Sequence, residues 1–255
     1  MKLNFKIYGE GFPILIMHGL LGSLDNWQSV AKSLAEDKMV ITIDLRNHGR
    51  SMHSPVFNYQ AMVDDVLAFL EEQHIFRTHV LGHSMGGKVA MYFALQNADF
   101  VEKLIVADIA PIQYIAHHED VFKGLSAVPL PSIQSRQEAE TILAAYLKEE
   151  SVIQFLMKGL YRKDDNQFSW RFNLNDIITN YENILSFESK DGAIFEGQTL
   201  FIRGEKSNYI QDKDRSQMLK MFPNMQLETI LGAGHWLHAE KPKEFIDLVK
   251  EFLKE

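Results

Sequence analysis

Five short apolar runs rich in β-branched residues recur along the chain and constrain its fold more than any other feature. They span residues 39–45, 78–83, 102–108, 199–204 and 227–232. A continuous apolar run, as opposed to an alternating one, is typical of a strand that is buried on both faces of a parallel sheet. Helical stripes lie between several of these runs, and another stripe follows the last run. This alternation predicts an α/β fold with a mostly parallel central sheet flanked by helices.

The N-terminal segment contains two further strand-like stretches, residues 2–8 and 13–18, on either side of a short turn. The turn is Gly9-Glu10-Gly11, and glycine-containing turns of this length commonly join antiparallel strands. We therefore expect the chain to begin with a β-hairpin.

The alternation of strands and helices fails over residues 111–190, where no strong strand-like run occurs. Ser135 and Glu138 have the spacing of a capping box, and a helical stripe follows them. We therefore expect residues 111–190 to form a helical cap that is inserted before the last two strands. Residues 1–110 and 191–255 are expected to form the core.

The composition excludes several classes of function. The formal net charge is −8 at pH 7, which argues against a nucleic-acid groove and against stable association with anionic membranes. The chain has no cysteine, so disulfides, thiolate nucleophiles and cysteine-based metal sites are excluded. No apolar run approaches the roughly 18 residues of a transmembrane helix, and the first residues lack the pattern of a signal peptide. We therefore expect a cytoplasmic protein.

The stretch VLGHSMGGKVAM, residues 80–91, joins the end of a strand-like run to a helical pattern through a glycine-rich turn. One interpretation is a phosphate-binding loop, but Val89 stands where a Ser or Thr would bind Mg²⁺. The other is the G-x-S-x-G turn of a nucleophile elbow, which residues 82–86 fit fully. The helix N-terminus that follows would favour negative charge beside Ser84. We therefore predict that Ser84 is a nucleophile; the alternative is a structural turn with an incidental serine.

A serine hydroxyl needs a base to accept its proton. His235 is the candidate because it lies just after the last strand-like run, where two nearby glycines allow the backbone to present its side chain over the strand end. His238 is interpreted as a locally packed residue. The pair His117 and His118 lacks the spacing of a metal-binding motif, so it is interpreted as a solvated face of the cap.

An oxyanion hole needs two backbone N–H donors. Met85, directly after Ser84, provides the first. The second is expected from the loop after the first long strand, where His18-Gly19 lets the chain turn toward the elbow and Leu20 N–H becomes the predicted donor. A plain glycine turn is the alternative interpretation of this loop.

Five motifs occur along the chain in the order HGLLGSLDNW, DLRNHGRS, GHSMGGK, VADIAP and GAGHWLHAEKP. In this order and spacing they resemble the α/β-hydrolases, and more narrowly the small bacterial serine esterases of the YbfF type. The resemblance implies a carboxylic-ester hydrolase for short acyl esters, with acyl thioesters as further small-molecule substrates. It also implies that the second motif braces the loop beside the site. The reaction requires no metal and no organic cofactor.

Other reactions and roles occur on the same fold. Dehalogenases of this fold carry Asp at the nucleophile position, so Ser84 excludes them. C–C bond hydrolases and cofactor-free haloperoxidases share the Ser–His arrangement and stay open as alternatives. A small-molecule receptor with slow turnover is the third alternative.

Three residues are candidates for the acid that orients the base. Glu205 and Asp212 lie after the fourth apolar run, where most members of the fold carry the acid, but Ser207 stands at the expected position. Asp108 ends the preceding run at the C-terminal edge of the sheet, from which it can reach His235. The resemblance favours Asp108 as the acid and Ser207 as an auxiliary group.

Several large side chains of the insert are candidates for the wall of a substrate pocket. They are Phe155, Met157, Tyr161 and Trp170. Apolar residues at helical spacing pack in a core more often than they line a pocket, so core packing is the alternative for this set.

Overall fold

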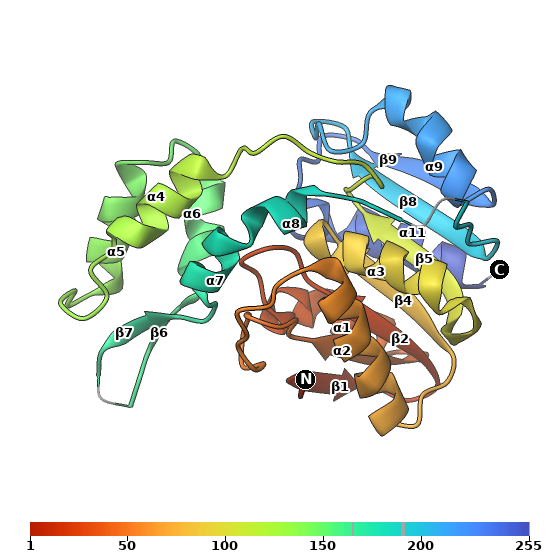
Figure 1. The fold of residues 1–255 in the computed structure, drawn as a ribbon, viewed down its shortest axis with the longest axis horizontal. Coiled ribbons are helices and arrows are strands. Elements are labelled where there is room, and N and C mark those ends of the chain that lie inside the picture. Colours follow the sequence, from red (N-terminus) through yellow and green to blue (C-terminus); the bar gives the residue numbers. More distant parts are fainter. Residues whose placement is uncertain (165, 190–191, 255) are drawn as a thin grey trace.

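The computed structural model describes residues 1–164, 166–189 and 192–254, and a seven-stranded sheet lies at the centre of this part of the chain (Figure 1). The strands follow the spatial order β1-β3-β2-β4-β5-β8-β9. Their bounds are Phe5–Tyr8 for β1, Phe12–Met17 for β2, Lys38–Ile43 for β3, Thr78–His83 for β4, Val101–Ala107 for β5, Gln198–Gly204 for β8 and Met225–Ile230 for β9. Strand β1 is antiparallel to β3, and the other neighbouring pairs are parallel. The predicted mostly parallel sheet is confirmed.

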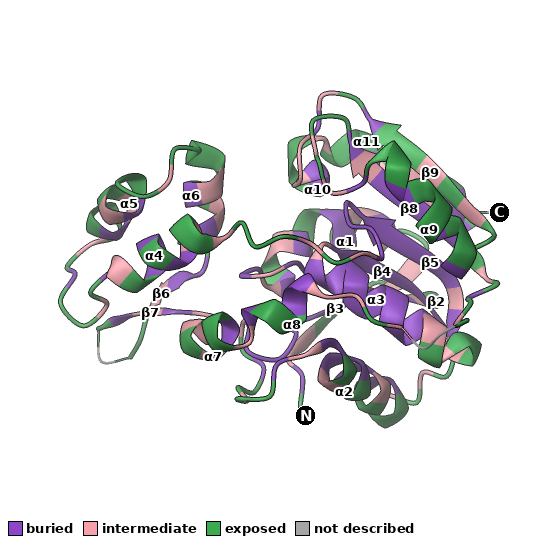
Figure 2. Cartoon of the chain, turned by 45° about the horizontal axis from the view of Figure 1, so that its top comes forward, coloured by how far each residue is buried: buried purple, intermediate pink, exposed green. Residues whose placement is uncertain are grey.

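Helices cover both faces of this sheet. The α-helices of the core are α1 (Gln28–Leu34), α2 (Tyr59–Glu72), α3 (Met85–Gln96), α9 (Arg215–Met221), α10 (Leu237–Glu240) and α11 (Pro242–Lys254), with short 3₁₀ turns at Leu24–Trp27, Ala98–Phe100 and Asp212–Asp214. Alternate residues of β2 point to opposite faces, so Ile14 and Ile16 pack with α1 and α11, whereas Leu15 and Met17 pack with α2 and α3. Helix α3 is buried along most of its length (Figure 2). None of the helices in the described ranges is long and apolar enough to cross a membrane, and the expected cytoplasmic location stays a prediction.

The expected N-terminal hairpin is wrong, because β3 lies between β1 and β2 and pairs with both. Gly9 adopts a φ of 68°, and a Cβ atom there would lie 2.4 Å from the carbonyl oxygen of Ala35. The turn therefore packs against the connection between α1 and β3 and does not fold β2 back onto β1. This arrangement gives the apolar strand β3 a hydrogen-bonded neighbour on each side.

Five α-helices and a short antiparallel strand pair occupy the described part of the chain between β5 and β8. Their bounds are α4 (Glu119–Ala127), α5 (Arg136–Ala144), α6 (Glu150–Met157), β6 (Leu160–Arg162), β7 (Phe168–Trp170), α7 (Leu174–Thr179) and α8 (Tyr181–Leu185). As predicted, Ser135 is the N-cap of α5, and its side chain accepts a hydrogen bond from Glu138 N. The mainly helical character of this insert is observed, whereas its expected boundary between residues 190 and 191 lies outside the described residues.

The insert projects to one side of the sheet, with α7 and α8 lying between the other cap helices and the core (Figure 1). One continuous cluster of buried apolar residues joins the two parts, and it includes Phe57 and Val89 from the core and Leu143, Leu156 and Phe172 from the insert. Polar contacts add to it, since Asn183 Nδ2 donates to the carbonyl oxygen of Phe57 (3.2 Å). The insert is thus packed as part of the molecule's interior.

Deletion of residues 112–188, with a short Gly-Ser linker in their place, should produce aggregated protein. The deletion uncovers the apolar surface that α7 and α8 cover, and exposed patches of this kind promote association. Size-exclusion chromatography with light scattering measures the outcome. A monodisperse and fully active core would contradict the shared apolar cluster described above.

Candidate active site

Ser84 lies at the sharp turn between β4 and α3. Its backbone has a φ of 52° and a ψ of −119°, a region that non-glycine residues rarely adopt and that stores strain at functional sites. The side chain is carried at the carboxyl end of the strand and at the first turn of the helix. This is the geometry of a nucleophile elbow.

Glycines make this turn sterically feasible. A Cβ atom on Gly82 would lie 2.1 Å from the carbonyl oxygen of Gly86, and a Cβ atom on Gly86 would lie 2.5 Å from the carbonyl oxygen of His18. A Cβ atom on Gly19 would lie 3.3 Å from that of Ser84. The loop that begins at His18 is therefore held directly against the elbow.

His235 and Asp108 meet across the carboxyl edge of the sheet. His235 Nδ1 lies 2.6 Å from Asp108 Oδ2, although 127 residues separate them in the sequence. Asp108 is fully buried and directly follows β5. Because a carboxylate only accepts hydrogen bonds, His235 Nδ1 carries the proton and Nε2 is left as an acceptor. Ser84 and His235 both line the same cavity.

The two other candidate acids have different partners. Asp212 forms an ion pair with Arg203 at 2.7 Å, and its side chain is 89% exposed. Glu205 accepts a hydrogen bond from the backbone N–H of Gly232 (2.7 Å). Of the three candidates, Asp108 is the one that the structure brings to the histidine.

Ser207 lies beside this pair, and its role as an auxiliary group stays a prediction. Its hydroxyl donates to Asp108 Oδ2, and its oxygen accepts a hydrogen bond from the backbone N–H of Tyr209 (3.2 Å). The other carboxylate oxygen of Asp108 accepts from Gly204 N (3.1 Å). The buried charge of Asp108 is thus stabilised by hydrogen bonds on both of its oxygens.

Two contacts of His235, a ring stack and a hydrogen bond, were missed by the sequence analysis. The ring of Tyr209 stacks on the His235 ring, with 3.9 Å between the centroids and 20° between the planes. His83 Nε2 donates to the carbonyl oxygen of His235 (2.8 Å). His83 is part of the G-x-S-x-G motif, but its contact with a loop that lies 152 residues away has no local signal.

Leu20 and Met85, the residues of the candidate oxyanion hole, line a cavity together with Ser84. Within the described part of the chain, neither N–H donates to a protein acceptor. The neighbouring amides are already used, because Leu21 N donates to His48 Nε2 (3.0 Å) and Gly22 N donates to Gly19 O (3.1 Å). The Leu20 N–H is therefore available for a substrate oxygen.

Two buried neutral histidines hold this loop. His18 Nδ1 donates to Gly19 O (2.8 Å), and His18 Nε2 accepts from Leu45 N (3.0 Å). His48 Nδ1 donates to the carbonyl oxygen of Arg46 (2.9 Å) while its Nε2 holds the loop amide. Burial lowers the pKa of His18 to about 4 and that of His48 to about 3. The DLRNHGRS turn thus contacts the loop beside the site, as the resemblance implied.

A cavity of about 530 Å³ opens above Ser84. Of the four predicted pocket residues, only Phe155 lines it. Met157 lies two residues further along α6, so its side chain points away from the cavity into the apolar cluster. Tyr161 packs under Arg171, and the Trp170 ring stacks on another cap ring. These three pocket assignments are corrected: the core-packing alternative describes Met157 and Trp170, whereas Tyr161 is half-buried and belongs to no apolar cluster of the described residues.

The walls of this cavity come mostly from residues that the sequence analysis did not single out for the pocket. They include Leu21, Asn26, Trp27, Val121, Leu147, Val152, Leu156 and Trp236. The interpretation of His117 and His118 as a solvated face is also corrected for His118, because this residue lines the cavity and burial lowers its pKa to about 3. Among the described residues, no cluster of three or more His, Asp and Glu side chains is arranged to hold a metal ion.

A strained serine between β4 and α3, beside a His–Asp pair at the carboxyl edge of a parallel sheet, defines an α/β-hydrolase. The model of the α/β-hydrolase fold family matches residues 13–242, and the chain belongs to this family. Esterase YbfF of Escherichia coli (strain K12) is 38% identical over 261 residues, covering 100% of both chains. The sn-1-specific diacylglycerol lipase ABHD11 of Danio rerio is 41% identical over 265 residues, covering 100% of this chain and 83% of the relative. A solved structure described as a marine microorganism esterase has a TM-score of 0.96 and 41% identity, covering 98% of this chain and 99% of its own.

The free energy of unfolding should fall as the pH is lowered from 7.5 to 5. Burial lowers the pKa of six histidines: to between about 3 and about 4 for His18, His48, His79, His118 and His238, and well below the usual value for His83. In the unfolded chain these histidines bind protons near pH 6.5, whereas in the folded chain they stay neutral. The free energy of unfolding is therefore highest above pH 6.5 and decreases as the pH falls below that value. Urea unfolding at several pH values should give a dependence of the free energy on pH that is equivalent, near pH 5, to the uptake of roughly five or six protons on unfolding. Most carboxyl groups stay ionised between pH 7.5 and 5, so they contribute little to this dependence. A free energy of unfolding that is constant over this range would contradict the assignment of neutral buried histidines.

Proposed function

We propose that the chain is a serine carboxylic-ester hydrolase that acts on short acyl esters and acyl thioesters. The observation that carries this proposal is the 2.6 Å contact of His235 Nδ1 with the buried Asp108, in a cavity that Ser84 also lines. This contact leaves Nε2 free to act as the base. The names of the relatives, an esterase and a diacylglycerol lipase, support an ester as the bond that is cleaved.

In the proposed reaction, Ser84 Oγ attacks the acyl carbon while His235 accepts the hydroxyl proton. The N–H groups of Leu20 and Met85 bind the oxyanion, each contributing about 3–4 kcal/mol to the lowering of the barrier. Asp108 stabilises the imidazolium, which then donates its proton to the leaving alcohol or thiol. A water molecule, deprotonated by His235, hydrolyses the acyl-enzyme and regenerates Ser84.

Ester turnover across a series of p-nitrophenyl esters from C2 to C16 tests the reaction class. We expect rapid turnover with a maximum at short chains. Ser84→Ala should reduce kcat to less than about 1% of the wild-type value without changing the melting temperature by more than a few degrees, because the geometry of the turn depends on its glycines. Failure of the wild-type protein to turn over any ester, combined with stabilisation by a small-molecule ligand, would favour a receptor.

Asp108→Asn should lower kcat by about 10³–10⁴-fold, because an amide at this position no longer stabilises the imidazolium or selects the correct tautomer. The matched control is Asp212→Asn, which should cost less than about tenfold because that side chain is exposed and paired with Arg203. Ser207→Ala should have an intermediate effect through its hydrogen bond to Asp108. Steady-state kinetics with one short-chain ester measures all three. A severe Asp212→Asn and a mild Asp108→Asn would place the acid elsewhere.

A further inference from the structure

Two cavities of very different size meet at Ser84. The larger, of about 530 Å³, is lined by His235 and opens toward α4 and α6. The smaller, of about 30 Å³, is lined by Met85, Lys88 and Ile184, and it shares Tyr209, His117 and His118 with the larger one. His235 lines only the larger cavity, whereas Ser84 and Leu20 line both.

The chemistry of ester cleavage assigns a different group to each cavity. The leaving oxygen must receive a proton from His235 Nε2, so the alcohol part of the ester has to lie on the side that His235 lines. The carbonyl oxygen points to the N–H groups of Leu20 and Met85. The remaining substituent of the acyl carbon is the acyl chain, and the space at Ser84 that Met85 lines and His235 does not is the small chamber.

We propose that the small chamber is the acyl site and admits an acetyl or propionyl group, while the large cavity takes a bulky, apolar alcohol. This inference rests on the proposed ester hydrolysis and adds the division of the substrate between the two cavities. A space of about 30 Å³ is roughly that of two water molecules, since one requires about 10–15 Å³. The methyl or ethyl group of an acetyl or propionyl ester matches such a space, whereas the propyl group of a butyryl ester exceeds it.

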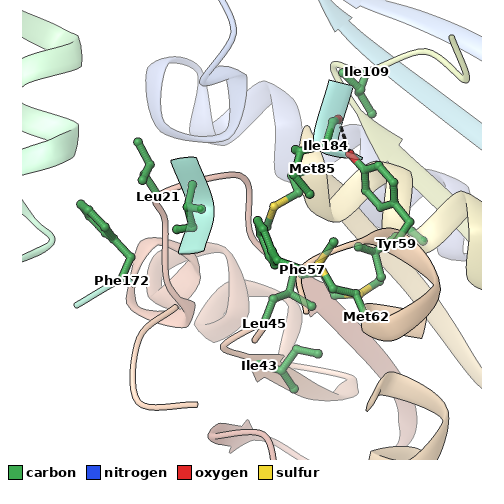
Figure 3. Packing of buried hydrophobic residues seen from close by; sticks show 14 of the residues in the cluster. Leu21, Ile43, Leu45, Phe57, Tyr59, Met62, Met85, Ile109, Phe172 and Ile184 are labelled. Carbon is green, nitrogen blue, oxygen red and sulfur yellow. Dashed lines mark hydrogen bonds between the residues drawn. The ribbon is translucent and has the colours of Figure 1, made fainter. Parts of the chain in front are cut away.

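Buried side chains close the small chamber where α8 meets the core. Figure 3 shows Ile184, Ile109, Met85 and Tyr59 gathered in this region, with the Tyr59 hydroxyl bonded to the carbonyl oxygen of Ile184 at 2.8 Å. These four residues are all at least nine-tenths buried. A longer acyl chain would have to displace α8 from the core, which breaks this hydrogen bond and the packing around it.

Lys88, which lines the chamber, is already hydrogen-bonded to the backbone. Lys88 Nζ donates to the carbonyl oxygens of Leu185 and Ser186, both at 2.8 Å, and lies 4.8 Å from the centre of the Tyr114 ring. Burial lowers the pKa of Lys88 to about 7, which indicates a dry environment. An occupant of the chamber therefore meets no unpaired donor on Lys88, which favours a short hydrocarbon group beside this residue.

The large cavity has the opposite character, because it is roomy and has an amphipathic lining. The ring centroids of Phe155 and Trp236 lie 5.2 Å apart. Trp27 lines a further part of the wall. Lys148 and Glu149 add polar groups to the lining. A volume of about 530 Å³ falls within the range of pockets that hold drug-sized ligands.

Two ester series measured with the wild-type protein test this division. In the first, the acyl group of 2-naphthyl esters is lengthened from acetate through propionate and butyrate to hexanoate, and we expect kcat/KM to fall at least tenfold beyond propionate. In the second, the alcohol of acetate esters is enlarged from ethanol to 2-phenylethanol and 2-naphthol, and we expect KM to fall. Faster cleavage of the hexanoate than of the acetate overturns the assignment and leaves ester hydrolysis intact. Failure to cleave any ester of either series overturns both.

Variants of the chamber wall give an independent measurement. Ile184→Ala should raise the ratio of hexanoate to acetate kcat/KM by at least tenfold, because it removes side-chain volume from the acyl site. Ile184→Val is the milder version if the alanine variant does not fold. The matched control is Ile177→Val in α7, which is buried and lines neither cavity, and its ratio should equal that of the wild type. An unchanged ratio in a folded Ile184 variant overturns the proposal.

Discussion

The Asp108 carboxylate joins three parts of the carboxyl edge of the sheet. It directly follows β5, and it accepts hydrogen bonds from Gly204 N at the end of β8, from the Ser207 hydroxyl in the next loop and from His235 Nδ1 in the loop after β9. A fully buried carboxylate is stable only where such partners replace water. The orientation of His235 therefore depends on the parallel order β5-β8-β9, which brings these groups to one place.

Neutral imidazoles perform the corresponding task on the opposite side of Ser84. His18 and His48 each donate through Nδ1 to a backbone oxygen and accept a backbone N–H at Nε2. Both roles require the neutral ring, and burial favours that form. Their hydrogen bonds fix the loop that contains Leu20 without using its N–H. The two sides of the site thus depend on opposite electrostatic conditions, a stabilised charge at Asp108 and the absence of charge at the histidines.

The insert and the elbow share one helix as their support. Helix α3 begins one residue after Ser84, and one turn further it carries Lys88, which binds the backbone at the end of α8. The cap is therefore anchored on the element that presents Ser84. On its other side the insert approaches the core through the contact of Phe155 with Trp236. The insert is thus hydrogen-bonded to the core near α8 but contacts it through aromatic rings near α6. This difference is consistent with a small chamber on the α8 side and a large cavity on the α6 side.

Signals between near neighbours in the sequence were enough to predict the strands, the capping of α5 and the turn at residues 82–86, because burial periodicity and glycine sterics act over a few residues. The resemblance narrowed the acid to Asp108, but its contact with His235 joins residues 127 positions apart and depends on strand order. Strand order also explains why the predicted hairpin is wrong: β3 lies between β1 and β2 and pairs with both of them. The sequence also could not show which face of α6 lines the cavity. In the structure Phe155 lines the cavity and Met157 packs in the apolar cluster. Packing decided these features, because the face that a helix or strand presents is set by elements distant in the sequence.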